Sequence, residues 1–327
     1  MRPRIFLTQP VADSAIARLK AVADVTLNAD PLHIASKAEL LEAARNHDFI
    51  FCLLHDKIDA DVINANPQLK AIASMTITPA DIDTTAASAR KLPVTVIPAL
   101  LLNEPTADLA FALLLATARR VAEGDRVMRS GIFPGSQSNY LESGAVSRKT
   151  LGLIGVGGVG TAMAQRARGF SMKVIYHDPR RLTPDKEHEL GATWVSFEQV
   201  FRDSDFVSLH VQLAPETRHL IGAPQLALMK PTAYLINSAR GPVIDELALV
   251  QALQENRIAG AGLDVYEHEP LPHPALLKMN NVVCTPHMGS AVRELRAAMA
   301  NVVVDNILAI IEGRKPPNCW NAEIYKS

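Results

Sequence analysis

This sequence has few cysteines, almost no net charge and no long apolar run. Its three cysteines, Cys52, Cys284 and Cys319, lie in or beside apolar segments without CxxC spacing, which predicts buried free thiols in a reducing, cytoplasmic compartment rather than a disulfide framework. The 33 basic and 34 acidic side chains leave a net charge of −1, so nothing indicates binding to nucleic acid or an anionic membrane. No run of about 18 consecutive apolar residues could span a bilayer, and the amino end leads into a short strand-like segment, residues 5–7, instead of a signal core. These absences favour a small-molecule ligand.

The composition that is present is that of a globular protein. With 327 residues, 48% of them hydrophobic and 20% charged, the chain is long enough for about two domains. Ser36 and Glu39 form a capping-box sequence, and Asp59 can cap the next helix. Over the first 100 residues, alanine-rich helical segments alternate with β-branched runs, which is typical of parallel βα units. These strand candidates are residues 5–7, 49–53, 70–73 and 94–97.

The same alternation returns in the second half of the chain. Pro105, placed as a first-turn residue, predicts one long helix that reaches toward Met128. Ser290 predicts the N-cap of a final helix that runs to about Glu312 and crosses back to the first domain. We therefore predict an α/β protein with two doubly wound parallel-sheet domains, residues 1–100 plus 291–327 and residues 101–290. The strand candidates of the second domain are residues 151–154, 174–177, 206–210, 233–237, 261–265 and 282–284.

A glycine-rich run joins the first of these strands to a helical stretch. Gly155 permits a tight turn, Gly157 lets the backbone approach a pyrophosphate, and Gly160 lets the helix pack against the strand. Asp178 ends the next strand candidate, eighteen residues after Gly160 (178 − 160 = 18), where an acid can bind ribose hydroxyls. This spacing predicts a site for a nicotinamide or flavin dinucleotide.

Three ionisable residues follow later strands: Arg240, Glu269 and His287. The carboxyl ends of strands are where ligands bind in doubly wound sheets. His287 can exchange a proton near neutral pH, and Glu269 can orient its imidazole. Arg240 offers a planar fork that binds a carboxylate through two hydrogen bonds. Together they suit the reduction of a 2-oxo acid, which needs a hydride at C2, a proton for the oxygen and an anchor for the carboxylate.

Other chemistry is not predicted. His268 and His273 are five residues apart, and two prolines between them prevent a zinc-binding helix. Cys284 and His287 supply only two potential ligands, so we expect no metal. The sequence also lacks the GxSxG elbow of serine hydrolases and the GxxxxGK[ST] loop of phosphoryl transfer.

Several blocks resemble the signature motifs of the D-isomer-specific 2-hydroxyacid dehydrogenases. The blocks are Thr150 to Gly160, Ser204 to His210, Met229 to Pro231, Asn237 to Gly241 with Asp245-Glu246, Gly262 to Pro270, and Thr285 to His287 with Gly289. The resemblance is specific from about residue 104 to 296 and loose before that. It implies a Rossmann dinucleotide-binding domain and a flavodoxin-like substrate domain, in a homodimer that forms through the long helix and the loop after it.

The resemblance also implies roles for individual residues. Arg240 is then the substrate-binding arginine, Glu269 the carboxylate partner and His287 the acid/base. The NAD site is implied to include Gly155, Gly157, Gly158, Val159, Gly160, Asp178, Ser238, Ala239, Arg240, Asp264 and Thr106. Asp178 favours NAD over NADP because a carboxylate repels a 2′-phosphate, while Arg180 and Arg181 could act in the opposite direction.

The substrate loop departs from the family pattern. Where many members have a glycine-rich carboxylate-binding loop, this chain has Met75, Thr76 and Ile77, whose backbone amides turn less freely toward an anion. Phosphite-oxidising relatives share an arginine like Arg296 but use a lysine where this chain has Ile77, and formate-oxidising relatives replace Glu269 with glutamine. The interpretation is therefore an NAD-dependent enzyme interconverting a 2-oxo acid and a D-2-hydroxy acid; a phosphite-type dehydrogenase and a non-catalytic NADH-sensing protein are the alternatives.

Overall fold

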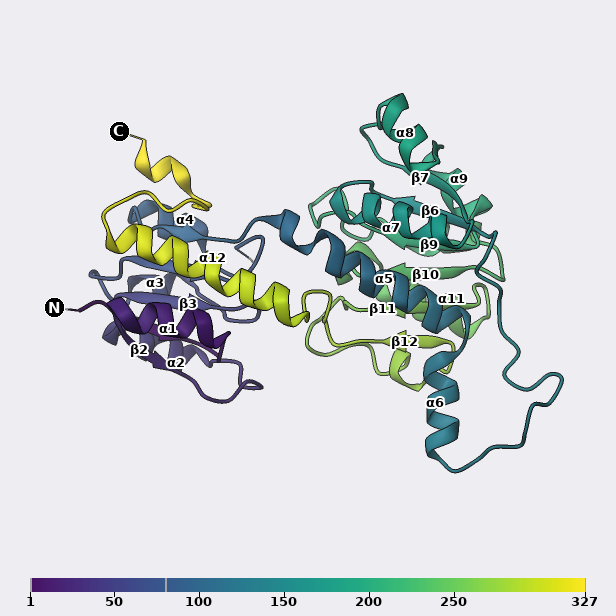
Figure 1. The fold of residues 1–327 in the computed structure, drawn as a ribbon, viewed down its shortest axis with the longest axis horizontal. Helices are drawn as coiled ribbons and strands as arrows, with labels where there is room; N and C mark the ends of the chain where they lie inside the picture. The colour runs from purple at the N-terminus through teal and green to yellow at the C-terminus, as the bar shows by residue number, and fades with distance from the viewer. Residues whose placement is uncertain (1, 80, 327) are drawn as a thin grey trace. The chain divides into compact units, whose positions relative to one another are not determined.

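The computed structural model describes residues 2–79 and 81–326 (Figure 1). Its contacts divide the chain into two units: unit 1 contains Met1–Leu101 and Val292–Ser327, and unit 2 contains Leu102–Ala291. Only Cys52 of the three free cysteines is fully buried, so the prediction of buried thiols was wrong for Cys284 and Cys319, which are partly exposed.

Unit 1 is a parallel sheet covered by helices. Among the described residues its strand order is β2-β1-β3-β4-β5, which is the flavodoxin-like order. The predicted capping box is present at Ser36 and Glu39, and Asp59 caps α3 through the amides of Asp61 and Val62. The elements are β1 (Arg4–Leu7), α1 (Asp13–Val22), β2 (Asp24–Leu27), α2 (Lys37–Asn46), β3 (Phe49–Cys52), α3 (Ala60–Asn64), β4 (Ala71–Ser74), α4 (Thr84–Ala89), β5 (Val94–Thr95) and α12 (Arg293–Ile311).

The final helix, α12, returns to unit 1 and packs against α1 and β4 (Figure 1). Its N-cap is Val292, without a side-chain cap, so the prediction of Ser290 was wrong by two residues. Asn306 of α12 is fully buried. Its amide donates a hydrogen bond to the carbonyl of Val96 (3.2 Å) and accepts one from the amide of Asn318 (3.0 Å). This side chain therefore ties the returning helix to the segments after β5 and after α12.

Unit 2 is a larger parallel sheet of the Rossmann type. Within the described residues its strand order is β12-β11-β10-β9-β6-β7-β8. The order reverses between β6 and β9, which is where such sheets bind ligands. The elements are α5 (Asn103–Ala118), α6 (Val121–Arg129), β6 (Thr150–Ile154), α7 (Gly158–Gly169), β7 (Lys173–His177), α8 (Pro184–Leu190), β8 (Ala192–Trp194), α9 (Phe197–Asp203), β9 (Phe206–Leu209), α10 (Ala223–Leu228), β10 (Tyr234–Asn237), α11 (Glu246–Gln254), β11 (Gly260–Leu263) and β12 (Val282–Cys284).

The long helix predicted from Pro105 to Met128 is in fact two helices. Arg120 lies in the left-handed region (φ 52°) between α5 and α6 and so interrupts the helical hydrogen bonding. The stretch Ala99–Ala118 is long and apolar enough to cross a membrane by length and composition. However, Ala107, Ala110 and Leu114 are fully buried and α5 packs on α7 and on the sheet, so this helix is part of the core of unit 2.

The buried amide of Asn306 provides a test of how α12 is held. We expect Asn306→Ala to lower the free energy of unfolding by about 2 kcal/mol, because it leaves the buried carbonyl of Val96 and the partly buried amide of Asn318 without these partners. The neighbouring Asp305→Asn removes an exposed ion pair with Arg18 and should cost less than about 1 kcal/mol. Urea unfolding followed by Trp320 fluorescence, in a Trp194→Phe background, measures both; equal costs would contradict the assigned role of Asn306.

Candidate active site

The glycine loop lies between β6 and α7, at the reversal point of the sheet. Gly155 has φ +89°, which only glycine adopts easily. A Cβ on Gly160 would overlap the carbonyl oxygen of Gly155, whereas a Cβ on Gly157 would meet nothing within 4 Å. Helix α7 begins without a side-chain cap, so its first amides are available to a ligand. A side chain would therefore strain the loop at Gly155 and Gly160, and the approach of a pyrophosphate to Gly157 stays a prediction.

Asp178 follows β7 and contacts the glycine loop directly. One carboxylate oxygen accepts a hydrogen bond from the amide of Val156 (3.1 Å), and the other accepts from the amide of Arg180 (3.0 Å). The acid is thus held at the edge of the loop, where the dinucleotide pattern expects a ribose.

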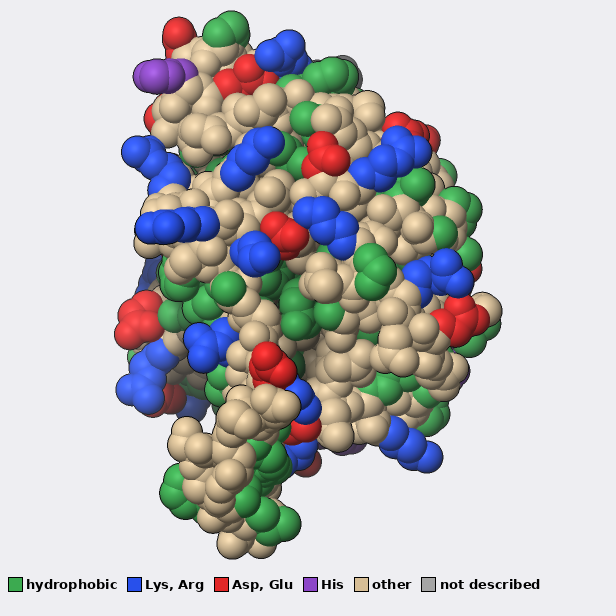
Figure 2. Space-filling view, turned by 90° about the vertical axis from the view of Figure 1, so that its right-hand side faces the viewer, with side chains coloured by type: hydrophobic (Ala, Val, Ile, Leu, Met, Phe, Trp, Pro, Cys, Tyr) green, Lys and Arg blue, Asp and Glu red, His purple; other side chains and the backbone are tan. Residues whose placement is uncertain are grey.

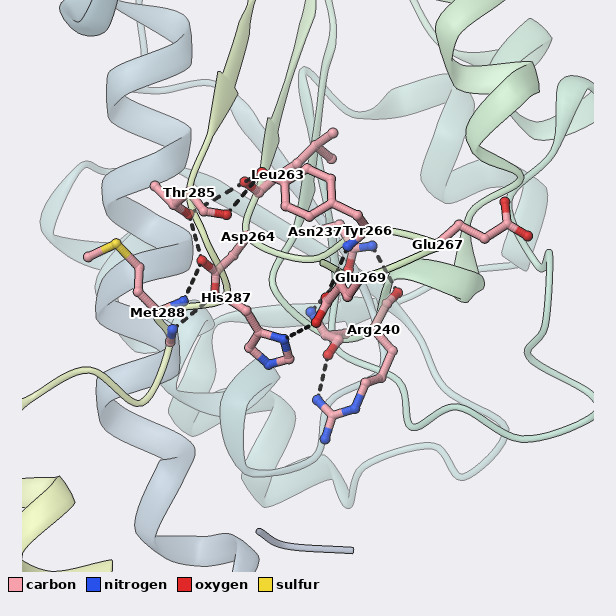
Figure 3. A network of polar contacts seen from close by, with 12 residues as sticks. Asn237, Arg240, Leu263, Asp264, Tyr266, Glu267, Glu269, Thr285, His287 and Met288 are labelled. Carbon is pink, nitrogen blue, oxygen red and sulfur yellow. Dashed lines mark hydrogen bonds and ion pairs between the residues drawn. The ribbon is translucent and has the colours of Figure 1, made fainter. Parts of the chain in front are cut away.

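The imidazole of His287 and the carboxylate of Glu269 form a close pair (Figure 3). Nδ1 of His287 lies 2.7 Å from Oε2 of Glu269, and the two side chains are 24% and 18% exposed. The amide of Tyr266 donates to the other carboxylate oxygen (3.1 Å). Because a carboxylate only accepts, Nδ1 carries the hydrogen, and Nε2 is the nitrogen through which the imidazole can exchange a proton.

Asp264 holds the loop that carries His287. Its carboxylate is 1% exposed and accepts three hydrogen bonds, from the hydroxyl of Thr285 (2.6 Å) and the amides of Met288 (2.8 Å) and Gly289 (2.9 Å). Burial raises the pKa of Asp264, and these three donors oppose that rise. His287 itself has φ 49°, a left-handed conformation that costs a non-glycine residue roughly 1–3 kcal/mol. The hydrogen bonds of Asp264 therefore hold a loop in which His287, the residue that faces Glu269, has a strained backbone conformation.

Arg240 lies in a turn that follows β10. Asn237 organises this turn, since its carboxamide accepts from the amide of Ala239 (3.0 Å) and donates to the carbonyl of Arg240 (3.0 Å). The guanidinium donates to the carbonyl of Ala239 (2.6 Å). Burial lowers the pKa of Arg240 while the nearby Glu269 carboxylate raises it, and an arginine so placed stays protonated. Figure 3 shows Arg240 at the same end of the strands as His287 and Glu269.

Two acidic residues to which the sequence analysis assigned no role fix the Glu269 loop. The carboxylate of Glu246, at the start of α11, accepts from the amides of Glu267 (2.9 Å) and His273 (2.7 Å), on either side of Glu269. In return Glu267 accepts from the amide of Glu246 (3.3 Å) and pairs with His219 (2.5 Å). An acidic residue at the start of a helix usually indicates only a favourable helix terminus, so the sequence carried no signal for this contact.

The surroundings of the glycine loop fit a bound dinucleotide. Among the described residues, Nδ1 of His210 and Oγ of Ser238 are buried without a hydrogen-bond partner. His210 follows β9, the neighbour of β6, and Ser238 follows β10, the next strand in the sheet. Burial lowers the pKa of His210 to about 3, so its imidazole is neutral. Ala239 neighbours Ser238, and Val159 lies in the first turn of α7. Thr106 is buried against Gly289.

The predicted substrate residues follow β4 in unit 1 and are considered with that unit alone. The hydroxyl of Thr76 lies 2.6 Å from that of Ser74 and donates to the carbonyl of Thr78 (2.5 Å), so it serves the loop itself. Met75 and Ile77 are partly exposed.

The comparisons with known proteins agree with one another. The model of the NAD-binding domain of D-isomer specific 2-hydroxyacid dehydrogenases matches residues 111–289. A glyoxylate reductase from Thermococcus litoralis is 43% identical over 332 residues, which cover 100% of this chain and 99% of the relative. The structure of the TT0316 protein from Thermus thermophilus superposes with a TM-score of 0.89 at 39% identity, covering 97% of this chain and 99% of that one. An NADPH-dependent glyoxylate/hydroxypyruvate reductase from Sinorhizobium meliloti gives a TM-score of 0.80 at 30% identity over 97% of both chains.

The glycine loop yields a paired prediction. Gly157→Ala should leave stability within about 0.5 kcal/mol of the wild type, because the new methyl group enters open space, yet weaken NADH binding at least about tenfold by blocking the pyrophosphate. Gly160→Ala should lower stability by about 1–3 kcal/mol, because the methyl group meets the Gly155 carbonyl. Thermal unfolding and NADH fluorescence titration separate the two effects; unchanged NADH affinity in Gly157→Ala would contradict this placement of the cofactor.

Proposed function

We propose that this chain, which belongs to the D-isomer-specific 2-hydroxyacid dehydrogenase family, is an NAD-dependent oxidoreductase that interconverts a 2-oxo acid and a D-2-hydroxy acid. The observation that carries the proposal is the 2.7 Å contact between Nδ1 of His287 and Glu269. It leaves Nε2 as the proton donor to the carbonyl oxygen during reduction and as the acceptor during oxidation, an effect typically worth roughly 10²–10⁴ in rate. Glu269 keeps the ring oriented throughout.

Arg240 binds the carboxylate of the substrate. Its fork makes two parallel hydrogen bonds that orient C2 and polarise the neighbouring carbonyl. A nicotinamide cofactor held by the glycine loop, Asp178 and Ser238 would supply or accept the hydride. The partial burial of Arg240, Glu269 and His287 strengthens their electrostatic effect on the developing alkoxide.

We assign choice of substrate to the β4 loop of unit 1. Met75 and Ile77 present partly exposed apolar side chains, while Thr76 rigidifies the loop through Ser74 and Thr78. Such a loop favours a small 2-oxo acid with an uncharged substituent. The 43% identity to a glyoxylate reductase supports glyoxylate as the first substrate to assay.

We propose NAD as the cofactor. Asp178 is fixed by two backbone amides at the edge of the glycine loop, and in the proposed site its charge would oppose a 2′-phosphate. The S. meliloti relative is NADPH-dependent, so family membership alone does not decide between the two cofactors.

The catalytic assignment is tested with NADH and a panel of glyoxylate, hydroxypyruvate and phenylpyruvate. His287→Ala should lower kcat by roughly 10²–10⁴ because the proton donor is lost. Arg240→Ala should mainly lower kcat/KM because substrate orientation is lost. His188→Ala, on the exposed surface of α8, is the matched control and should retain full activity. Absence of turnover with every 2-oxo acid, or full activity in His287→Ala, would refute the assignment.

We further propose that the chain forms a homodimer through α6 and the loop after it. Figure 2 shows hydrophobic side chains on the projecting part at its lower edge. The exposed apolar residues of α6 and the loop after it are Val121, Met128, Ile132, Phe133 and Tyr140. Phe133 is 73% exposed, and clustered exposed apolar residues indicate a protein interface.

The dimer is tested by changing this cluster to charged residues. Phe133→Asp combined with Met128→Asp should convert a dimer to a monomer, because two charges would be buried at the interface. Light scattering after size-exclusion chromatography measures the mass. Leu247→Asp, a 67% exposed residue on α11, is the control and should leave the mass unchanged. A wild-type monomer at micromolar concentration would contradict the proposal.

A further inference from the structure

The loop after β7 contains two arginines, Arg180 and Arg181, and the second of them is already paired with a carboxylate. The guanidinium of Arg181 forms a two-pronged contact with the carboxylate of Glu187 on α8, through Nε (2.8 Å) and Nη2 (3.0 Å). Arg181 is 62% exposed, whereas Glu187 is only 14% exposed. Both hydrogen bonds of the fork are therefore directed inward to Glu187.

Glu187 is itself anchored to the sheet. The hydroxyl of Tyr176, in β7, donates to Oε1 of Glu187 (2.7 Å) and accepts from the amide of Leu182 (2.9 Å). Tyr176 is fully buried, so this anchor cannot swing outward with the surface helix. The Arg181 and Tyr176 hydrogen bonds lower the pKa of Glu187 to about 2, so its carboxylate is ionised at neutral pH. We call the trio Tyr176, Glu187 and Arg181 the arginine latch.

The arginine latch is adjacent to Asp178. The indole Nε1 of Trp194 donates to the carbonyl of Asp178 (3.3 Å), and the guanidinium of Arg181 lies over the Trp194 ring, 5.9 Å from its centroid. Arg181 also comes only three residues after Asp178 in the chain. A guanidinium this close to the ribose-binding acid is within the region where arginines bind the 2′-phosphate of NADP.

We propose that Glu187 is a positioning residue that favours NAD over NADP, because its ion pair with Arg181 keeps that guanidinium from binding a 2′-phosphate. This inference rests on the proposed use of a nicotinamide dinucleotide. Two effects then weaken the binding of NADP. Asp178 repels the 2′-phosphate, and Glu187 neutralises the charge of Arg181, which would otherwise attract that phosphate. Of the two arginines in the loop, Arg180 alone keeps a guanidinium outside this ion pair, and it is exposed.

The test is direct binding of NADH and NADPH, measured by nucleotide fluorescence without any oxo acid. Glu187→Gln keeps the shape of the side chain but removes its charge, so Arg181 is released. We expect its NADPH Kd to fall roughly tenfold while its NADH Kd is unchanged. Glu189→Gln is the matched control, because Glu189 lies on the same helix and pairs with Lys186 (2.8 Å) instead.

A double-mutant cycle shows whether the effect passes through Arg181. Arg181→Ala alone should leave both dissociation constants unchanged, and adding it to Glu187→Gln should abolish the gain in NADPH affinity. Tyr176→Phe removes only the hydroxyl that anchors Glu187 and should also increase the affinity for NADPH, but by less. This conservative variant provides a second test in case Glu187→Gln does not fold.

The outcomes distinguish the latch from the proposed function. Equal shifts for NADH and NADPH in Glu187→Gln, or a gain in NADPH affinity that persists without Arg181, would overturn the latch and leave the dehydrogenase assignment intact. A wild-type protein that binds neither dinucleotide would overturn the proposed function and the latch together. Loss of turnover in a variant does not enter the result, because only binding is measured.

Discussion

The buried carboxylate of Asp264 is the constraint on which the candidate site depends. A carboxyl group that is 1% exposed is costly to bury unless it is fully hydrogen-bonded, and here Thr285, Met288 and Gly289 supply the donors from a single loop. The same three contacts fix that loop with His287 in a left-handed conformation. The desolvation cost of the carboxylate and the backbone strain at His287 are thus offset by one set of hydrogen bonds. The backbone amide of His287 adds a further hydrogen bond, to the carbonyl of Asp264 (2.9 Å), and so helps to hold the imidazole against Glu269.

The order of the parallel strands explains why residues distant in sequence meet. Arg240, Glu269 and His287 follow β10, β11 and β12, which are consecutive neighbours in the sheet. Neighbouring strands are about 4.8 Å apart, so the loops after their carboxyl ends are necessarily close. Gly241 presses against the carbonyl of Tyr266, where even a Cβ would overlap, and Glu246 secures the far side of the Glu269 loop. The fold brings the loops together, and these short-range contacts set the side-chain geometry.

This distinction shows what could be predicted from the sequence. The two parallel sheets, the capping box at Ser36 and the position of the glycine loop between a strand and a helix depend on local patterns, and these were predicted correctly. The sheet-edge strands β2 and β8 were missed because they are short and largely exposed and so lack an apolar run. The break at Arg120 was missed because a tertiary contact supports it, in which the guanidinium of Arg120 donates to the carbonyl of Glu142. Glu246 was missed for the same reason: its partners are backbone amides more than 20 residues away.

The two halves of the candidate site lie on opposite sides of the reversal point of the sheet. Arg240, Glu269 and His287 follow β10–β12 on one side, while Asp178 and the arginine latch lie by β7 and β8 on the other. The carboxylate of Glu187 accepts hydrogen bonds from Tyr176 and Arg181, whereas Nδ1 of His287 lies against Glu269, so we expect a substitution near β7 to leave the His287–Glu269 contact in place. Under the proposed function, such separation would let one reaction geometry serve either dinucleotide. One relative at 30% identity keeps the fold and is NADPH-dependent, so we infer that the electrostatics around Asp178 is a property of each chain rather than of the family.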